Sequence, residues 1–298
     1  MATAGGAYRR QNERDFRSDV LSYRGDTPFS GALYRACGLE EPARQALRHG
    51  PIRITDAMSG PGKVWKDVIG PRYTEYMRAH TDARGILVTF NDSRAEAVDP
   101  MAGQGYATLV CDVREIGRRA ASTGFHPQEI IVVRYGIKEL PRDDQAMALH
   151  EIHGFLEEGG RVVLGEIYSE GERDKAGFQT VHGMKHFFAG RNISVEGALH
   201  IPTISEWKEY LTSAGFEVAD EYTHYDTSPV TPVKSWSGQF QAPKGSNEEE
   251  EILAKLNWLV KQTATGNPDF ARVSKAHEEN GVMSFEFPIV VLAGVKRG

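Results

Sequence analysis

The sequence predicts an α/β fold: a doubly wound, mostly parallel sheet of seven strands, with helices on both faces and helical cap insertions. Three observations predict it. Short apolar runs alternate with segments of helical periodicity, which is the pattern of strand–helix–strand units. The first three runs each end at an acidic residue, and the first is followed at once by a glycine-rich turn. The composition, 40% hydrophobic and 26% charged over 298 residues, is ordinary for a folded chain.

Strands and helices are expected in strict alternation over the first half of the chain. The expected strands cover 52–56, 86–91, 106–111 and 129–133, and the helices between them lie near 62–80, 93–102 and 113–122. The next helix should begin at Pro141, because the acids Asp143 and Asp144 then lie at the positive end of its dipole. Apolar residues recur every three or four positions as far as Leu156, and Gly159-Gly160 is expected to end this helix.

The second half of the chain is less regular. A fifth strand is expected over 161–167, and residues 169–204 follow with no clear periodicity. A short helix near 205–214 should end at Gly215, which suits a left-handed cap. The last two strands begin near 217 and 287. Between them, Asn247 is expected to cap a helix whose first turn is acidic and whose apolar face carries Ile252, Leu256, Leu259 and Val260.

These elements suggest three segments. Residues 1–50 are expected to form an N-terminal helical cap, residues 51–226 and 286–298 the α/β core, and residues 227–285 an inserted helical cap or interface segment. The insertion is far longer than an ordinary connection between strands. Because the apolar face of its helix has no partner that the sequence assigns, we expect either packing onto the core or a homodimer.

Charge and cysteine content exclude several classes of protein. The net charge of −6, with basic residues spread along the chain, gives no electrostatic reason to bind nucleic acid. No apolar stretch approaches the ~20 residues that span a bilayer, and the N-terminus lacks a signal-peptide core. Cys37 and Cys111 are far apart and form no metal or redox motif, so a reduced, cytoplasmic compartment is expected.

Three carboxylates are expected to meet at one edge of the sheet. Asp56, Asp92 and Asp112 each follow an apolar run, and the carboxyl ends of parallel strands line the crevice where open α/β sheets bind ligands. Acids suit ribose hydroxyls, an adenine amine and a cationic amino group, whereas they repel phosphates. The turn at 56–62 reads DAMSGPG, and its glycines would let a ligand approach the backbone closely.

A nicotinamide-dependent oxidoreductase is the weaker alternative. A dinucleotide site requires G-x-G-x-x-G, and this chain has Trp65 at the third glycine. Such a site also places its ribose acid about 20 residues on, whereas Asp92 lies thirty residues after Gly62.

On these residues the chain resembles the class I S-adenosylmethionine-dependent methyltransferases. Residues 56–62 are similar to that family's D-x-G-x-G-x-G turn, with Met58 in place of the first glycine. Residues 133–138 and 148–166 resemble the region after the fourth strand in C-methyltransferases of the ubiquinone and menaquinone pathways and their small-molecule relatives. Residues 207–216 resemble the helix that precedes the sixth strand there, so the resemblance covers roughly 50–225 and 286–297.

The resemblance implies a Rossmann-like fold, S-adenosylmethionine as cofactor and S-adenosylhomocysteine as product. It implies methyl transfer to oxygen, nitrogen or carbon of a small, aromatic or carboxylated metabolite of secondary metabolism. The residues that it implies at the cofactor, with Tyr23 added as an aromatic lid, are Asp56, Met58, Ser59, Gly60, Gly62, Asp92, Ser93, Asp112, Val113, Arg134 and Tyr135.

Two residues are the candidates for catalysis. His200, in the region where relatives build their acceptor pocket, is the candidate general base, and Tyr135 would contact the reacting methyl group. His182 and His186 are alternatives for the base, and each histidine could equally be structural. No metal site is expected, because the string from His150 to His153 lacks the i, i+4 spacing of a zinc helix. A catalytically silent module that binds the cofactor or a protein partner is the other alternative.

Overall fold

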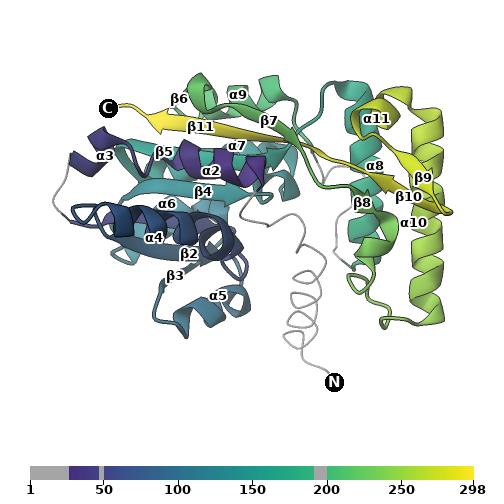
Figure 1. The fold of residues 1–298 in the computed structure, drawn as a ribbon, viewed down its shortest axis with the longest axis horizontal. Helices are drawn as coiled ribbons and strands as arrows, with labels where there is room; N and C mark the ends of the chain where they lie inside the picture. Colours follow the sequence, from purple (N-terminus) through teal and green to yellow (C-terminus); the bar gives the residue numbers. More distant parts are fainter. Residues whose placement is uncertain (1–26, 47–49, 191–199) are drawn as a thin grey trace.

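A computed structural model describes residues 27–46, 50–190 and 200–298, so Tyr23 and much of the N-terminal cap lie outside the described residues. The strands of the main sheet are β1 (Ile52–Ala57), β2 (Ile86–Asp92), β3 (Ala107–Val110), β4 (Gln128–Arg134), β5 (Leu156–Ile167), β6 (Phe216–Val218), β7 (His224–Thr227) and β11 (Pro288–Lys296). Their order is β3-β2-β1-β4-β5-β11-β6, and β7 also pairs with β11 (Figure 1).

The sheet is parallel through its first five strands and antiparallel at β11. Strands β6 and β7 pair with different halves of β11, and the turn η5 (Asp220–Tyr222) separates them. The two short strands therefore share one place in the sheet, which gives the seven positions that the sequence predicted. The doubly wound, mostly parallel fold class is confirmed.

Helices cover both faces of this sheet. One hydrophobic core lies under α2 (Pro28–Cys37), η2 (Val64–Ile69), α4 (Gly70–Ala79) and α5 (Ala95–Ala102). The other lies under η3 (Val113–Glu115), α6 (Ile116–Ser122), α7 (Arg142–Phe155) and α9 (Ile204–Ser213). The short segments α3 (Pro42–Ala46) and η4 (Ile137–Glu139) lie in the connections. The strand–helix alternation predicted from the apolar runs is present throughout the first half of the chain.

Helix α7 begins where the acidic first turn predicted, but its predicted end at Gly159-Gly160 is wrong. Leu156 already has extended backbone angles (φ −81°, ψ 146°) and pairs with Gln128 of β4. Strand β5 thus starts directly after Phe155, and Gly159 takes a positive φ of 75° within the strand, near the register shift beside β4. Pairing with a neighbouring strand overrode the helical periodicity.

The region after β5 contains a helix that the periodicity did not predict. Helix α8 (Glu172–Phe188) runs for 17 residues. Its buried side chains include the polar Asp174, Lys175, His182 and His186, so the inner face is not marked by apolar residues alone. Amphipathic patterning finds a helix only where burial and hydrophobicity coincide.

The insertion forms a second, three-stranded sheet and two helices beside α8. The strands, β8 (Thr231–Pro232), β9 (His277–Glu279) and β10 (Val282–Phe285), pair in the order β8-β10-β9. With η6 (Val233–Trp236), α10 (Asn247–Gly266) and α11 (Pro268–Val273), they gather with α8 at one end of the molecule (Figure 1).

The long helix of this insertion packs within the chain. Ser246, not Asn247, caps α10, because the Ser246 hydroxyl accepts from the Glu249 N–H at 3.2 Å. Leu256 and Val260 are fully buried, and α10 packs against α8 and α11. Part of the apolar face thus packs within the chain, while Ile252 and Leu259 are only partly buried, and the homodimer stays a prediction.

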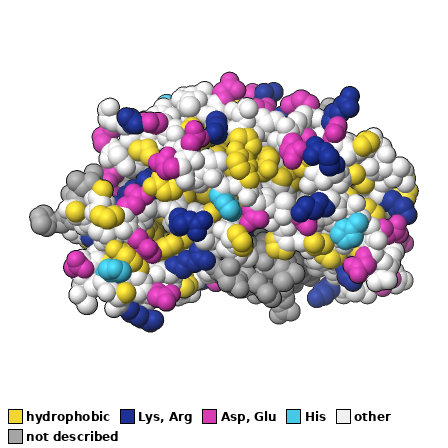
Figure 2. Space-filling model, turned by 45° about the horizontal axis from the view of Figure 1, so that its top comes forward, with side chains coloured by type: hydrophobic (Ala, Val, Ile, Leu, Met, Phe, Trp, Pro, Cys, Tyr) yellow, Lys and Arg dark blue, Asp and Glu magenta, His cyan; other side chains and the backbone are white. Residues whose placement is uncertain are grey.

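Acidic and basic side chains are intermixed on the face that Figure 2 shows, and hydrophobic side chains gather near its centre. Among the described residues, no helix is long and apolar enough to cross a bilayer.

Candidate functional site

The predicted cofactor-binding residues that the structure describes lie at or just after the carboxyl ends of β1 to β4, and the order of the sheet reverses between β1 and β4. Strand β1 lies between β2, the next strand along the chain, and β4, which comes after β3 at the far edge. Connections leave the sheet in opposite directions at such a switch point and open a crevice between them. The glycine turn follows β1, and residues 135–139 follow β4.

The glycine turn is held by the neighbouring strand β2. The Ser59 N–H donates to the Asn91 carbonyl (2.8 Å), and the Gly62 N–H donates to the Ser59 carbonyl (3.0 Å). Gly62 has a φ of +71°, and a Cβ there would lie 2.6 Å from the Phe90 ring. Gly60, with a φ of +51°, would place a Cβ in open space. Gly62 therefore serves packing, whereas Gly60 leaves bare backbone beside the crevice.

Met58 adopts the backbone conformation that glycine would favour. Its φ is +53°, a left-handed value that costs a residue with a side chain roughly 1–2 kcal/mol. Tyr135 has the same conformation in the opposite turn, with a φ of +54°. The two turns touch, since a Cβ on Gly136 would lie 2.7 Å from the Met58 sulfur. Strained backbone on both sides of one crevice is a frequent property of functional sites.

Asp56 is a buried carboxyl with unused acceptor capacity. Only 3% of it is exposed; Oδ2 accepts from the Trp65 N–H at 3.3 Å, and Oδ1 has no hydrogen-bond partner among the described residues. Burial raises the pKa of Asp56 to about 8, although the Trp65 hydrogen bond and the charge of Arg134 oppose the shift. A cationic group bound beside Asp56 would favour its ionised form.

Asp92 turns its carboxylate toward the glycine turn. Oδ2 accepts from the Gly60 N–H (3.1 Å) and Oδ1 from the Arg94 N–H (3.2 Å). The side chain is largely buried, while Ser93, the next residue, is exposed. Asp92 therefore ties the glycine turn to the end of β2.

Asp112 lies at the edge of the sheet and already has a charged partner. Arg114 donates to both of its oxygens, at 2.9 and 2.7 Å, and also contacts Asp144. The hydrogen bonds from Arg114 lower the pKa of Asp112, so it is ionised at neutral pH. Val113, directly after it, is buried.

An aromatic surface lies across the crevice from the glycine turn. Tyr135 stacks on Phe29 of α2, with ring centroids 6.0 Å apart and planes 7° from parallel. The Arg134 guanidinium lies 4.8 Å from the Tyr135 ring and 5.3 Å from the Phe29 ring. A helix of the N-terminal segment thus contributes directly to the neighbourhood of the predicted site.

Glu166, at the end of β5, was not predicted as a site residue. It is fully buried; Oε1 accepts from the Ile137 N–H (2.9 Å), and Oε2 has no partner among the described residues. Burial raises its pKa to about 7. Glu166 fixes the turn that carries Tyr135. The signal was present, because β5 ends in an acid just as the first three strands do.

His200 lies in a different neighbourhood from Tyr135. Its carbonyl accepts from Gln145 of α7 (2.7 Å), and its Nε2 lies 3.4 Å from Glu206 of α9. The ring packs near Tyr210, and burial lowers its pKa. The two residues predicted to be catalytic are therefore held by different elements, and their roles remain predictions.

The alternative histidines meet a carboxylate. His182 and His186, both on α8, lie with Glu139 of η4 so that one ligand atom from each falls within 4.8 Å of the others. Burial lowers the pKa of His182 to about 3, which keeps its ring neutral. The sequence contained the i, i+4 spacing of the histidines, but not the position of Glu139.

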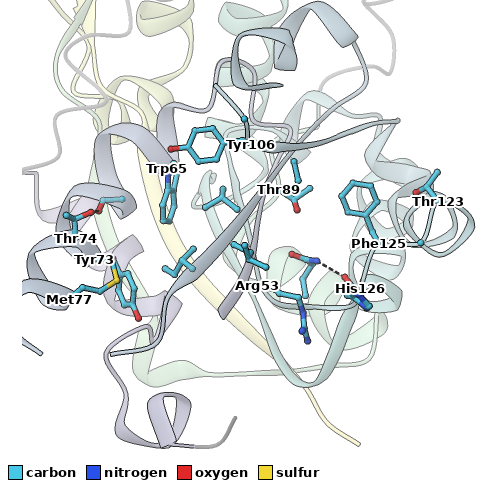
Figure 3. Close-up of a pocket in the computed structure, with 18 residues that line it drawn as sticks. Arg53, Trp65, Tyr73, Thr74, Met77, Thr89, Tyr106, Thr123, Phe125 and His126 are labelled. Atoms are coloured by element: carbon cyan, nitrogen blue, oxygen red, sulfur yellow. Dashed lines mark hydrogen bonds between the residues drawn. The ribbon is translucent and has the colours of Figure 1, made fainter. Parts of the chain in front are cut away.

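A cavity of about 640 Å³ lies away from this crevice (Figure 3). It opens at the amino ends of the strands, around Arg53, Thr89 and His126, with Trp65 and Tyr73 on one side and Phe125 on the other. None of the predicted site residues lines it. Asp56, Asp92 and the glycine turn lie at the opposite, carboxyl end of the strands, so the candidate site is not this cavity.

Solved structures share this fold at low sequence identity. YcgJ from Bacillus subtilis matches with a TM-score of 0.60 and 15% identity, over 89% of this chain and 99% of its own. BH2331 from Bacillus halodurans C-125, named as a candidate methyltransferase, matches with a TM-score of 0.59 and 16% identity, over 87% and 99%. A candidate sarcosine dimethylglycine methyltransferase from Galdieria sulphuraria matches at 0.53 and 10%, over 96% and 98%.

Neither protein-family models nor curated proteins match the sequence. The structural likeness therefore carries the classification: the chain has the fold of the class I S-adenosylmethionine-dependent methyltransferases, as its motifs indicated.

Proposed function

We propose that this chain is an enzyme that transfers a methyl group from S-adenosylmethionine to oxygen, nitrogen or carbon of a small metabolite. One observation carries the proposal: the glycine turn, Asp56 and Asp92 converge at the β1/β4 switch point of a methyltransferase fold.

The donor set of the crevice suits a sulfonium nucleoside. Asp56, with its unpartnered buried oxygen, would receive the cationic amino group of the amino acid moiety. Asp92 would accept from the ribose hydroxyls, while bare backbone at Gly60 lets the ligand approach. Asp112 and Val113 would hold the adenine ring at the sheet edge. Ser59 and Ser93 supply further hydroxyls along this path.

The protein's contribution to the reaction is mainly positional. The cofactor supplies a sulfonium methyl that is already electrophilic. Tyr135 and Arg134 would line the route between the cofactor and the acceptor. The partly exposed Tyr135 ring offers a stacking surface, with the buried Phe29 ring and Arg134 guanidinium packed behind it. These groups suit an aromatic or carboxylated acceptor. Alignment of nucleophile, carbon and sulfur would then supply most of the rate enhancement.

His200 is the proposed base when the acceptor carries a proton of low acidity. Its lowered pKa keeps the ring neutral near pH 7, as proton acceptance requires. The proposal further places the enzyme in cytoplasmic secondary metabolism, acting without nucleic acid. Cys37 and Cys111, which are buried and form no disulfide, are consistent with a reducing compartment.

The decisive test is Asp92→Ala, assayed by calorimetry with S-adenosylhomocysteine. Loss of charge-assisted hydrogen bonds should weaken binding by about 1.5–3 kcal/mol. Asp82→Ala, at an exposed position far from the crevice, is the matched control and should bind as the wild type does. Unchanged affinity in Asp92→Ala would remove this residue from the site. Nucleoside binding without methyl transfer across a broad acceptor panel would support a catalytically silent module instead.

A further inference from the structure

Two buried histidines and a glutamate form a cluster that the proposed methyl transfer does not require. His182 and His186 are one helical turn apart on α8, with 5% and 2% of their surfaces exposed. Their Nε2 atoms lie 3.9 and 3.5 Å from Glu139 Oε1, and their ring centroids are 4.5 Å apart.

Hydrogen bonding does not explain how His182 is accommodated. Both of its ring nitrogens are buried and lack a hydrogen-bond partner within the described part of the chain. Its separation from Glu139, 3.9 Å, is too long for a hydrogen bond. Buried imidazoles are normally satisfied, because an unmade hydrogen bond costs about 1–3 kcal/mol. A group that binds nitrogen lone pairs at a shorter distance would remove this cost.

The three ligand atoms lie within 4.8 Å of one another, which is close to the spacing around a bound transition metal. Ligand atoms about 2.0–2.2 Å from a common ion lie roughly 3–4 Å from one another. Two histidines and one carboxylate are the protein ligands of many zinc sites with an open position, and also of non-haem iron sites. We propose that Glu139, His182 and His186 bind a divalent transition-metal ion of the zinc type and leave a coordination position free.

Lys138 is the feature that opposes metal binding most directly. Its ammonium group is buried and donates to Glu139 Oε1 at 2.9 Å, so it would repel a cation. Glu139 has a second oxygen, however, and the buried Glu166 is another acidic neighbour of Lys138, with an oxygen that has no partner among the described residues. Metal binding would move the ammonium group from Glu139 toward Glu166.

The position of the cluster suggests what the metal would do. The Lys138 ammonium lies 6.0 Å from the Tyr135 ring, so the cluster adjoins the surface proposed for the acceptor. This inference rests on the proposed function. The metal would be a Lewis acid beside the acceptor, and it would favour an acceptor that binds the metal through a hydroxyl group. Coordination would release the hydroxyl proton to solvent. The oxygen would then bond to the methyl carbon, while the carbon–sulfur bond breaks and its electron pair stays on sulfur.

The test is a titration of chelator-treated full-length protein with Co²⁺, which reports its coordination through visible absorption. We expect one tightly bound ion per chain, with the intense bands of a four- or five-coordinate site. His182→Gln and His186→Gln should each weaken binding by more than about 100-fold, beyond the 10–100-fold typical of changes to outer partners. His150→Gln, an exposed histidine on α7, is the matched control and should retain the wild-type spectrum.

Lys138→Met tests the same site without removing a ligand. Loss of the neighbouring positive charge should tighten Co²⁺ binding several-fold, a result that a misfolded protein would not give. Weak binding with six-coordinate bands in the wild type, or wild-type affinity in both histidine variants, would overturn the inference. Calorimetry with S-adenosylhomocysteine on the same samples separates the proposals. Nucleoside binding without the metal spectrum overturns only the metal site, and the metal spectrum without nucleoside binding overturns only the proposed function.

Discussion

Asp56 and Asp112 follow strands in the same way, yet their surroundings give them opposite electrostatics. Asp56 lies on β1, between β2 and β4, where burial raises its pKa to about 8. Asp112 follows β3, the edge strand, where Arg114 lowers its pKa. An identical sequence signal thus yields a largely protonated carboxyl at the centre of the crevice and a paired carboxylate at its rim. Position in the sheet, which sequence spacing does not report, decides the charge.

The largest expected effect of this difference is on the pH dependence of nucleoside binding. In the free protein Asp56 must lose a proton to receive a cationic amino group, so binding should release a proton. Affinity for S-adenosylhomocysteine should therefore rise by up to about tenfold per pH unit as pH approaches 8. Calorimetry from pH 6 to 8 measures this rise in affinity, and Asp56→Asn should make the affinity less dependent on pH. An equally steep slope in Asp56→Asn would assign the proton to another group.

The second effect is on the stability of the free protein. Because the folded-state pKa of Asp56 lies above its unfolded value, its favourable contribution is complete below about pH 4 and is lost as pH rises through about 8. Asp56→Asn should remove that loss and still accept from the Trp65 N–H. We expect urea denaturation to show the variant gaining stability over the wild type between pH 6 and 8, by at most about 1.4 kcal/mol per pH unit. A constant difference would contradict the burial of an ionisable group.

The smallest effect is expected at the rim. Asp112 is partly exposed and already engaged by Arg114, so Asp112→Asn should weaken nucleoside binding by only about 0.5–1 kcal/mol. Because the pKa of Asp112 is lowered, Asp112→Asn should leave the pH dependence of nucleoside binding unchanged above pH 5, whereas Asp56→Asn should flatten it. Parallel titrations of the two asparagine variants would show this, and a steep pH dependence that disappears in Asp112→Asn would reverse the comparison.

The local part of the site could be predicted from the sequence. The acids at strand ends and the glycine turn depend on residues adjacent in the chain, and the parallel sheet brings them together by its own geometry. The backbone of Met58 shows how closely the turn follows this pattern, since a residue with a side chain adopts the left-handed conformation in place of glycine.

The features that the sequence did not predict depend on contacts between segments that are distant in the chain. Glu139 meets His182 and His186 only because α8 returns over the end of β4, and no spacing in the sequence specifies that return. Helix α8 was missed because polar side chains occupy its buried face, and the early end of α7 was missed because strand pairing began at Leu156. In each case tertiary packing, and not the local sequence pattern, determined the structure.

The joint between the two sheets has a mechanical consequence. Only Glu286 and Phe287 separate β10 from β11, and Phe287 exchanges hydrogen bonds with Ser228 while its ring packs against Phe285 and His182. Such a short, pinned connection leaves no slack for the smaller sheet to swing on a hinge. A displacement of His182 would be transmitted through the Phe287 ring to β11, which lies between β5 and β6 in the main sheet, so a ligand bound at His182 should shift both sheets together.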